Sequence, residues 1–213
     1  MLTRLLVLVY LCTTSLAQPT KPLTPKEACT RFMSKVVRID AGADTVASGF
    51  IISSDGWILT AGHVVFDHQT GQQLSTILVR LPDRTTSLAH IFVDRESVIR
   101  DFALLKVDKT DLPFLELGSW TEVDPGSEVT IIGYPFSAGA DASITTKFCL
   151  SGLVAATDTV SNNGVSVDAI YFQGPVVKGL SGGPVISRDT GHVVGIQSQK
   201  LAGISSALAA TRQ

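Results

Sequence analysis

Three residues whose types can act together in nucleophilic catalysis stand in apolar or small-residue segments far apart in the chain. His63 lies in the segment TAGHVV, Asp101 begins the segment DFALLK, and Ser181 lies in the segment GLSGGP. A serine hydroxyl is a weak nucleophile until a neighbouring base removes its proton. An imidazole is a suitable base near neutral pH, and a carboxylate can orient it. The chain therefore carries, in the order His, Asp and Ser, the groups needed for acyl transfer.

The segment around Ser181 also matches a different motif, G-x-S-x-G, which places a serine on a turn between a strand and a helix. That arrangement requires an acidic residue and then a histidine later in the chain, and only Asp189 and His192 follow in that order. The residues after Pro184 are β-branched and predict a strand where the motif needs a helix. This mismatch favours the first arrangement over an esterase or a lipase.

Other aspartates and histidines are weaker candidates for the same roles. Asp94 lies among charged residues and is expected in solvent, and Asp108 lies beside a lysine and is expected to end a strand. Asp101 begins an apolar strand, where a buried carboxylate is costly unless it has partners. The remaining histidines are expected to be ordinary polar residues; they are His68, His90 and His192.

The composition excludes several classes of function. Of the 213 residues, 45% are hydrophobic and 17% are charged, which is typical of a well-buried globular protein and not of a disordered one. The formal net charge is −2 and no cluster of lysine and arginine stands out, so we expect no nucleic-acid partner. The sequence has no H-E-x-x-H motif and no paired-cysteine spacing, so we expect no metal and no cofactor.

The first residues have the three-part layout of a secretory signal peptide. Arg4 precedes the apolar run LLVLVYLC, and Ser15 and Ala17 are spaced like a signal-peptidase site. We expect cleavage of residues 1–17 and a secreted or periplasmic protein. We expect no stable membrane anchor, because the apolar run is shorter than the roughly 20 residues that span a bilayer. Residues 18–33 are expected to form an extended lead-in that begins with several prolines.

Two cysteines are expected in the mature chain. Removal of the signal peptide would remove Cys12 and leave Cys29 and Cys149. An even pair in an oxidising compartment favours a disulfide. The sequence leaves two unpaired buried thiols as the alternative, because it does not measure the geometry that a bridge requires.

Short runs of β-forming residues between turn signals dominate the rest of the chain. A turn-rich stretch over residues 108–126 divides them into two groups of six, and no segment has a sustained helical period beyond one turn after His63. We therefore predict an all-β protein with one unit over residues 34–118 and another over residues 119–213. The expected strands are 36–39, 49–52, 57–60, 75–80, 87–93, 102–107, 128–132, 144–156, 165–172, 184–187, 192–198 and 204–208.

The blocks around the three candidates resemble those of trypsin-like serine proteases, in particular the Deg/HtrA-type branch. The segments SGFII and DGWILTAGHVV are similar to that family's histidine block, DFALLKV to its aspartate block, and GLSGGPV to its serine block. The resemblance covers residues 34–209 and implies two six-stranded antiparallel β-barrels with the active site between them. The sequence ends at Gln213, just past the last expected strand, so we expect no PDZ domain of the kind usual in that branch.

The resemblance implies a serine endopeptidase that works through an acyl-enzyme intermediate. Ser181 would attack the peptide carbonyl, His63 would accept and return the proton, and Asp101 would orient the imidazole. The backbone N–H groups of Gly179 and Ser181 would form the oxyanion hole. The substrate-binding residues that the resemblance implies are Pro175, Val176, Lys178 and Ser198, the last of which is also expected to bind Asp101.

Polypeptides are the expected substrates. No acidic residue is expected at the base of the specificity pocket, so we expect cleavage after small or medium apolar residues. Protein inhibitors are further candidate partners, and the sequence does not determine the oligomeric state. A catalytically silent homologue that acts as a binding module is the alternative from another class, because geometry decides whether a triad works.

Overall fold

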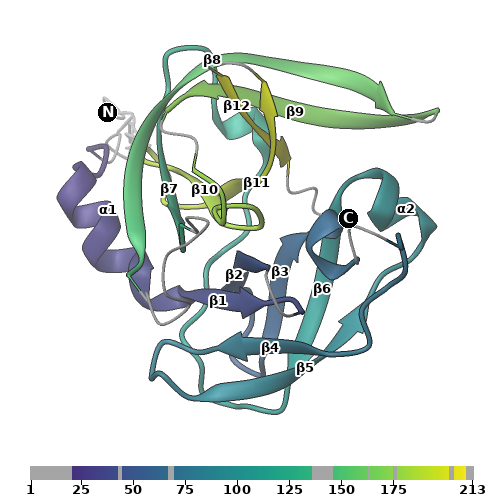
Figure 1. Cartoon of the computed structure of the whole chain (residues 1–213). Helices are drawn as coiled ribbons and strands as arrows, with labels where there is room; N and C mark the ends of the chain where they lie inside the picture. The colour runs from purple at the N-terminus through teal and green to yellow at the C-terminus, as the bar shows by residue number, and fades with distance from the viewer. Residues whose placement is uncertain are drawn as a thin grey trace, which may run out of the picture.

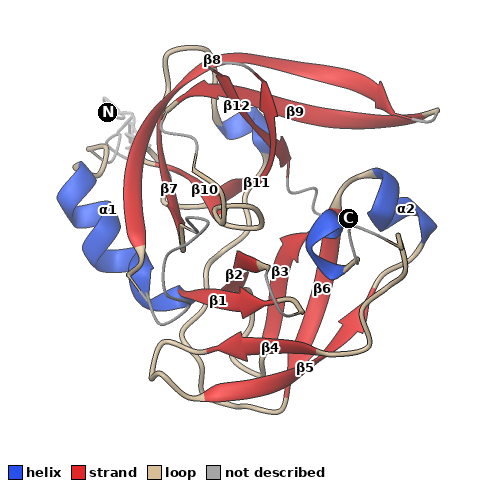
Figure 2. Ribbon diagram, viewed as in Figure 1, coloured by secondary structure: helices blue, strands red, loops and turns tan. Residues whose placement is uncertain are grey.

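The computed structural model describes residues 21–42, 45–66, 70–135, 146–162, 164–174, 177–201 and 204–209. Twelve strands hold nearly half of these residues (Figure 2). The first six strands are β1 (Val36–Asp40), β2 (Val46–Ile51), β3 (Trp57–Ala61), β4 (Ile77–Arg80), β5 (Thr86–Phe92) and β6 (Phe102–Val107). The other six are β7 (Glu128–Gly133), β8 (Phe148–Asn162), β9 (Val165–Gln173), β10 (Pro184–Ser187), β11 (Val193–Leu201) and β12 (Ile204–Ala209).

The strands close into two six-stranded antiparallel barrels, one below the other in Figure 1. The order around the first barrel is β1-β2-β3-β6-β5-β4, and around the second it is β10-β11-β12-β9-β8-β7. The predicted all-β, two-barrel fold is therefore confirmed. The expected signal peptide of residues 1–17 lies outside the described residues.

The first barrel brings the segments next to His63 and Asp101 together. The strand β3 pairs with β6 in the register Thr60↔Ala103 and Ala61↔Phe102. Residues of β6 alternate between the core and the outer face, as expected for a strand with one buried side. Because β3 ends just before His63 and β6 begins just after Asp101, this register places the two side chains at the same end of neighbouring strands.

The second barrel carries a long hairpin. Strand β8 was expected to end at residue 156, but it continues to Asn162 because it stays paired with β9 up to Val165. A register shift between Val154 and Ala156 marks where the hairpin bends, and its tip projects beyond the barrel, above helix α2 (Arg95–Ile99) in the view of Figure 1.

The prediction of an extended lead-in over residues 18–33 is wrong for residues 25–33, which are helical. Residues Pro25–Phe32 form helix α1, followed by the 3-10 turn η1 (Met33–Lys35). Thr24 and Glu27 form a capping box, and Pro25 occupies the first turn, where its missing N–H costs nothing. Ala28 and Phe32 are buried against the barrels, so tertiary packing stabilises a helix too short to show a clear period.

A disulfide and a set of hydrogen bonds attach helix α1 and the segment after it to β8 and the residue before it. Cys29 in α1 and Cys149 in β8 form a disulfide with a Cα–Cα distance of 5.8 Å. The ammonium group of Lys147 donates hydrogen bonds to the carbonyl oxygens of Met33 and, at 2.6 Å, of Val36. Burial lowers the pKa of Lys147 to about 8.

Two shorter helical segments lie next to the candidate residues His63 and Asp101 in the sequence. The 3-10 turn η2 (Gly62–Val65) follows β3, as the expected turn after His63 predicted. Helix α2 was missed, because five residues are too few for a detectable period. Asp94 caps α2 through the Ser97 N–H at 2.7 Å, so its side chain has a structural role. No helix in the described ranges is long and apolar enough to cross a bilayer.

The linker between the barrels is bound to the second barrel. Leu117 forms a parallel bridge with Val193, and the Gly118 N–H donates to the Val193 carbonyl at 2.9 Å. The 3-10 turn η3 (Trp120–Glu122) follows. These contacts fix the path of the chain from one barrel to the next.

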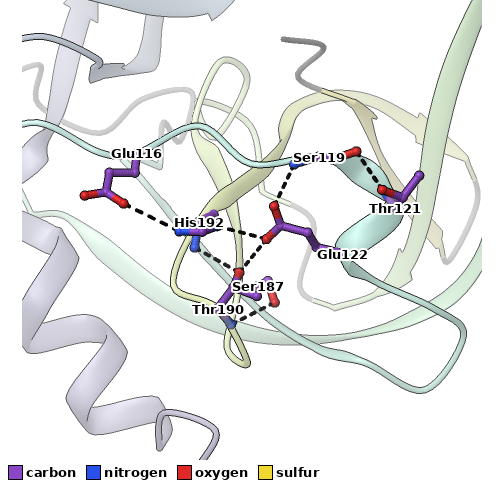
Figure 3. Close-up of polar contacts among 7 residues, drawn as sticks. All are labelled: Glu116, Ser119, Thr121, Glu122, Ser187, Thr190 and His192. Carbon is purple, nitrogen blue, oxygen red and sulfur yellow. Dashed lines mark hydrogen bonds and ion pairs between the residues drawn. The ribbon is translucent and has the colours of Figure 1, made fainter. Parts of the chain in front are cut away.

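His192 and Glu122 centre a polar cluster that reinforces this linker (Figure 3). The His192 Nδ1 atom lies 3.0 Å from Glu122 Oε2, and its Nε2 atom lies 3.5 Å from Glu116 Oε2. Glu122 also accepts hydrogen bonds from the Thr190 hydroxyl at 2.7 Å and the Ser119 N–H at 2.9 Å. The carboxylate thus joins the linker to the turn between β10 and β11.

This cluster predicts a pH-dependent contribution to stability. Burial would raise the pKa of Glu122, but its three hydrogen-bonding neighbours and the attraction to His192 hold the pKa below its usual 4.5. A carboxyl with a depressed folded pKa stabilises the fold above its unfolded pKa, and this contribution is lost as the pH falls through the folded pKa. Glu122→Gln should therefore be less stable than wild type at pH 7, with a difference that shrinks towards pH 3.

Urea denaturation between pH 7 and pH 3 measures that difference. The control is Glu96→Gln, which removes an exposed carboxylate on α2 outside the cluster and should differ little from wild type throughout. A difference for Glu122→Gln that stays constant with pH would contradict the role assigned to its charge.

Candidate active site

The Asp101 carboxylate holds the His63 imidazole where β3 and β6 lie side by side. His63 Nδ1 lies 3.0 Å from each of the two Asp101 carboxylate oxygens. The backbone N–H of His63 donates to Asp101 Oδ1 at 2.7 Å, so the carboxylate fixes both the backbone and the ring. With Nδ1 facing Asp101, Nε2 is the ring nitrogen left to exchange a proton with another group.

Asp101 adopts an unusual backbone conformation. Its φ is 53°, in the left-handed region that non-glycine residues seldom occupy and that aspartate tolerates better than most. Gly62 lies against this turn, and a Cβ at Gly62 would come 3.0 to 3.1 Å from the backbone of Asp101 and Phe102. The absence of a side chain at Gly62 therefore permits the close approach of the segments that carry His63 and Asp101.

The environment of Asp101 keeps its carboxylate charged. Burial alone would raise the pKa, since the side chain is only 16% exposed. Hydrogen bonds and attraction from His63, together with a hydrogen bond from the Ser198 hydroxyl, outweigh burial and hold the pKa of Asp101 below its usual value. The ionised carboxylate can therefore stabilise a protonated imidazole.

Ser181 lies in a tight loop before β10. The Leu180 N–H donates to the Val177 carbonyl at 3.3 Å, and Gly179 within this turn has a φ of 90°. A positive φ at that position is typical of a type II turn and favours glycine. The Ser181 side chain is partly exposed at the end of the loop.

Strand β11 and strands β2 and β3 bring the Ser181 loop to the His63–Asp101 pair. The Gly182 N–H donates to the Gln197 carbonyl at 2.7 Å, and the next residue of β11, Ser198, binds Asp101. The Ser48 N–H in β2 donates to the Ser181 carbonyl at 2.9 Å. Because neighbouring residues of one strand contact both the serine loop and the carboxylate, the Ser181 loop and the His63–Asp101 pair both lie at the junction of the barrels.

The residues predicted to bind substrate lie in different surroundings from one another. Lys178 is exposed on the turn before Ser181. Ser198 is buried, and its hydroxyl donates to Asp101 Oδ2, as the resemblance implied. Pro175 and Val176 lie outside the described residues.

The rival residues have other surroundings. Asp108 and His90 are exposed, and His192 binds Glu122. His68 lies outside the described residues. The residues after Ser181 form strand β10 and not a helix, so the strand–turn–helix context required by the alternative G-x-S-x-G motif is missing. Within the described ranges, no group of three His, Cys, Asp or Glu side chains is placed to hold a metal ion.

Two polar residues at the site were missed by the sequence analysis. Ser48 and Arg100 had no assigned role, although Ser48 stands in the histidine block and Arg100 directly precedes Asp101. The Arg100 Nη1 atom donates to the Ser166 carbonyl in β9 at 3.0 Å, which ties the long hairpin to the segment beside Asp101. A hydroxyl in an otherwise apolar strand was the sequence signal available for Ser48. No feature of the sequence indicated that Arg100 would bind the Ser166 carbonyl.

The sequence defines the family. The family model described as a trypsin-like peptidase domain matches residues 47–196, which is more than half of the chain. The chain therefore belongs to the trypsin-like peptidase family. The predicted resemblance to trypsin-like proteases is confirmed.

The chain is also similar to named bacterial proteins. A probable periplasmic serine endoprotease DegP-like from Pseudomonas fluorescens is 41% identical over 158 residues, which is 74% of this chain and 30% of that protein. The protein with the same description from Hahella chejuensis is 38% identical over 157 residues, with 74% and 30% covered. The chain thus spans less than a third of the length of these curated relatives.

Solved structures share the fold. The HtrA-type protease AlgW with a tripeptide superposes with a TM-score of 0.70 and 25% identity, over 88% of this chain and 60% of that one. The inactive form of the Rv3671c protease superposes with a TM-score of 0.68 and 22% identity, over 86% and 87%. These likenesses support the two-barrel architecture.

We predict that alanine substitution costs more stability at Gly182, in the serine loop, than at Gly126, although both glycines have a positive φ. Gly182 has a φ of 82°, and a Cβ there would overlap the Ser48 carbonyl oxygen and the Thr60 hydroxyl. Gly126 has a φ of 98° but no atom within 4 Å of its Cβ position. Both alanine variants should lose about 1–2 kcal/mol from backbone strain, and Gly182→Ala should lose more because backbone atoms must move.

Thermal unfolding compares Gly182→Ala with its control Gly126→Ala. Each additional kcal/mol lowers the melting temperature by about 2–4 °C in a chain of this size. Equal melting temperatures for the two variants would contradict the tight contact between the serine loop and the first barrel.

Proposed function

We propose that this protein is a serine endopeptidase that hydrolyses peptide bonds through His63, Asp101 and Ser181. The observation that carries the proposal is the partly buried His63–Asp101 pair, with Nδ1 at 3.0 Å from the carboxylate, beside a serine loop held at the same junction. The names of the relatives, which are serine endoproteases, support the same activity.

The proposed reaction proceeds through an acyl-enzyme. The Ser181 hydroxyl attacks the peptide carbonyl carbon while His63 Nε2 accepts its proton, and Asp101 stabilises the imidazolium that forms. The N–H groups of Gly179 and Ser181 stabilise the negative charge on the carbonyl oxygen. His63 then gives the proton to the leaving amine. Water, activated by His63 in the same way, hydrolyses the ester and restores Ser181.

The exposure of the two side chains suits these roles. The Asp101 side chain is 16% exposed and the His63 side chain 40%, so the carboxylate is shielded while one edge of the imidazole stays open. A shielded carboxylate interacts more strongly with the imidazolium than it would in water. An open Nε2 edge can reach both the nucleophile and the leaving group.

The proposal includes substrate class and location. We propose polypeptide substrates with a small or medium apolar residue before the cleaved bond, in a pocket lined by Pro175, Val176 and Lys178. The relatives are named as periplasmic proteins, and residues 1–17 have the layout of a signal peptide, so we propose export from the cytoplasm.

Covalent labelling tests the nucleophile. A fluorophosphonate probe should modify wild type at Ser181 and should not modify Ser181→Ala. Peptidase activity of Ser181→Ala should fall by about 10⁶-fold, as for other enzymes that lose this group. Labelling absent in wild type would contradict the proposal and fit a catalytically silent homologue, and a peptide-library profile with arginine, lysine or glutamate before the cut would contradict the specificity.

Replacement of the carboxylate tests the imidazole pair. Asp101→Asn should keep the shape of the site but lose the charge that holds His63 in the productive tautomer, so kcat should fall by about 10⁴-fold. Steady-state kinetics on a cleaved peptide measures this change, with Asp108→Asn as the matched control for an exposed aspartate at the other end of β6. A loss below tenfold for Asp101→Asn would show that Asp101 has no such role.

A further inference from the structure

Ser48 is a buried polar residue that takes no part in the reaction proposed above. It lies in β2, in the first barrel, and its relative exposure is 0%. A buried hydroxyl costs free energy unless it is hydrogen-bonded, so its partners indicate what it does. Those partners belong to segments 86 and 131 residues further along the chain.

The Ser48 hydroxyl is fixed in one orientation. Its Oγ atom accepts a hydrogen bond from the Tyr134 N–H at 2.8 Å. It also lies 2.7 Å from the Gly179 carbonyl oxygen, which can only accept. Since a serine hydroxyl has a single proton, that proton points at Gly179. The Tyr134 N–H after β7 therefore holds the hydroxyl, and the hydroxyl holds the serine loop.

The backbone of Ser48 reaches the same loop and the segment before His63. Its N–H donates to the Ser181 carbonyl at 2.9 Å, and its carbonyl accepts from the Thr60 hydroxyl at 2.8 Å. Gly133 leaves room for this arrangement, because a Cβ there would lie 2.5 Å from the Ser48 Oγ atom. One residue of the first barrel thus binds both ends of the segment Gly179–Ser181.

Gly179 needs such a contact. Glycine takes positive and negative φ about equally readily, so the observed φ of 90° is not imposed by the residue itself. A change of turn type would rotate the peptide group that precedes Gly179 and turn its N–H away from its present direction. Fixing the Gly179 carbonyl oxygen on one side and the Ser181 carbonyl on the other opposes that rotation.

We propose that Ser48 is a positioning residue that holds the N–H groups of Gly179 and Ser181 in the orientation required of an oxyanion hole. The inference rests on the proposed function, since it assigns a support to the same site. Ser48 acts through Gly179 and contacts no substrate. Its loss should therefore weaken binding of the transition state and leave binding of the substrate nearly unchanged.

The test is the kinetics of Ser48→Ala, with Ser187→Ala as the control. Ser187 is equally buried, and its hydroxyl accepts a hydrogen bond from the Thr190 N–H, in the turn after β10, at 3.4 Å. For Ser48→Ala, kcat should fall roughly 10- to 100-fold, less than the 10²- to 10³-fold typical of a lost oxyanion donor. The KM should stay within about twofold, and affinity for a peptide boronate should fall in parallel with kcat/KM. Ser187→Ala should keep the kcat of wild type.

Two outcomes would overturn the inference. One is a Ser48→Ala variant, folded at the assay temperature, whose kcat is within twofold of wild type. The other is a kcat loss of equal size in Ser187→Ala, which would indicate general loosening of the barrel. If Ser48→Ala does not fold, Ser48→Cys is tested in its place, because a thiol fills the site but is a weak hydrogen-bond donor. In that case, a wild-type kcat in Ser48→Cys overturns the inference.

The failure of this inference is distinguishable from failure of the proposed function. If wild type neither cleaves peptides nor reacts with the fluorophosphonate probe, the serine endopeptidase assignment fails. If wild type does both and Ser48→Ala keeps its kcat, only the role of Ser48 fails.

Discussion

The hydrogen bonds between the largely shielded Asp101 carboxylate and the His63 imidazole are the interaction on which the site depends. Asp101 would be costly to bury alone, yet His63 and Ser198 supply enough hydrogen bonds to keep its pKa below the usual value. The barrel provides this geometry through the pairing of β3 with β6 and the positive φ of Asp101. The first barrel therefore fixes the orientation of the imidazole that we propose as the base.

The proposed nucleophile, Ser181, belongs to the second barrel, so its proposed role requires a well-fixed junction between the barrels. Strand β11 contributes Gln197 to the serine loop and Ser198 to Asp101, and Ser48 reaches across from the first barrel. Away from the site, the disulfide to β8 fixes helix α1, and the polar cluster around Glu122 fixes the linker. Such preorganisation matters because small displacements of catalytic groups cost large factors in rate.

Much of this fold was predictable because its signals are local. Short runs of β-forming residues between turn signals predicted all twelve strands, and small residues around His63 and Ser181 indicated the site. The misses have physical causes. Helix α1 depends on a capping box, on burial of Phe32 and on a disulfide, none of which produces a long helical period. The role of Ser48 depends on partners 86 and 131 residues away, which no local pattern could reveal.

The central claim is that His63, Asp101 and the Ser181 loop form one proton-transfer line at the barrel junction. The most direct measurement is a crystal structure of the protein after reaction with a small phosphonate ester. Our account predicts phosphorus bonded to Ser181 Oγ, one phosphonyl oxygen bound by the N–H groups of Gly179 and Ser181, and His63 Nδ1 still on the Asp101 carboxylate. Phosphorus on another residue, or a His63 ring turned away from Asp101, would contradict it.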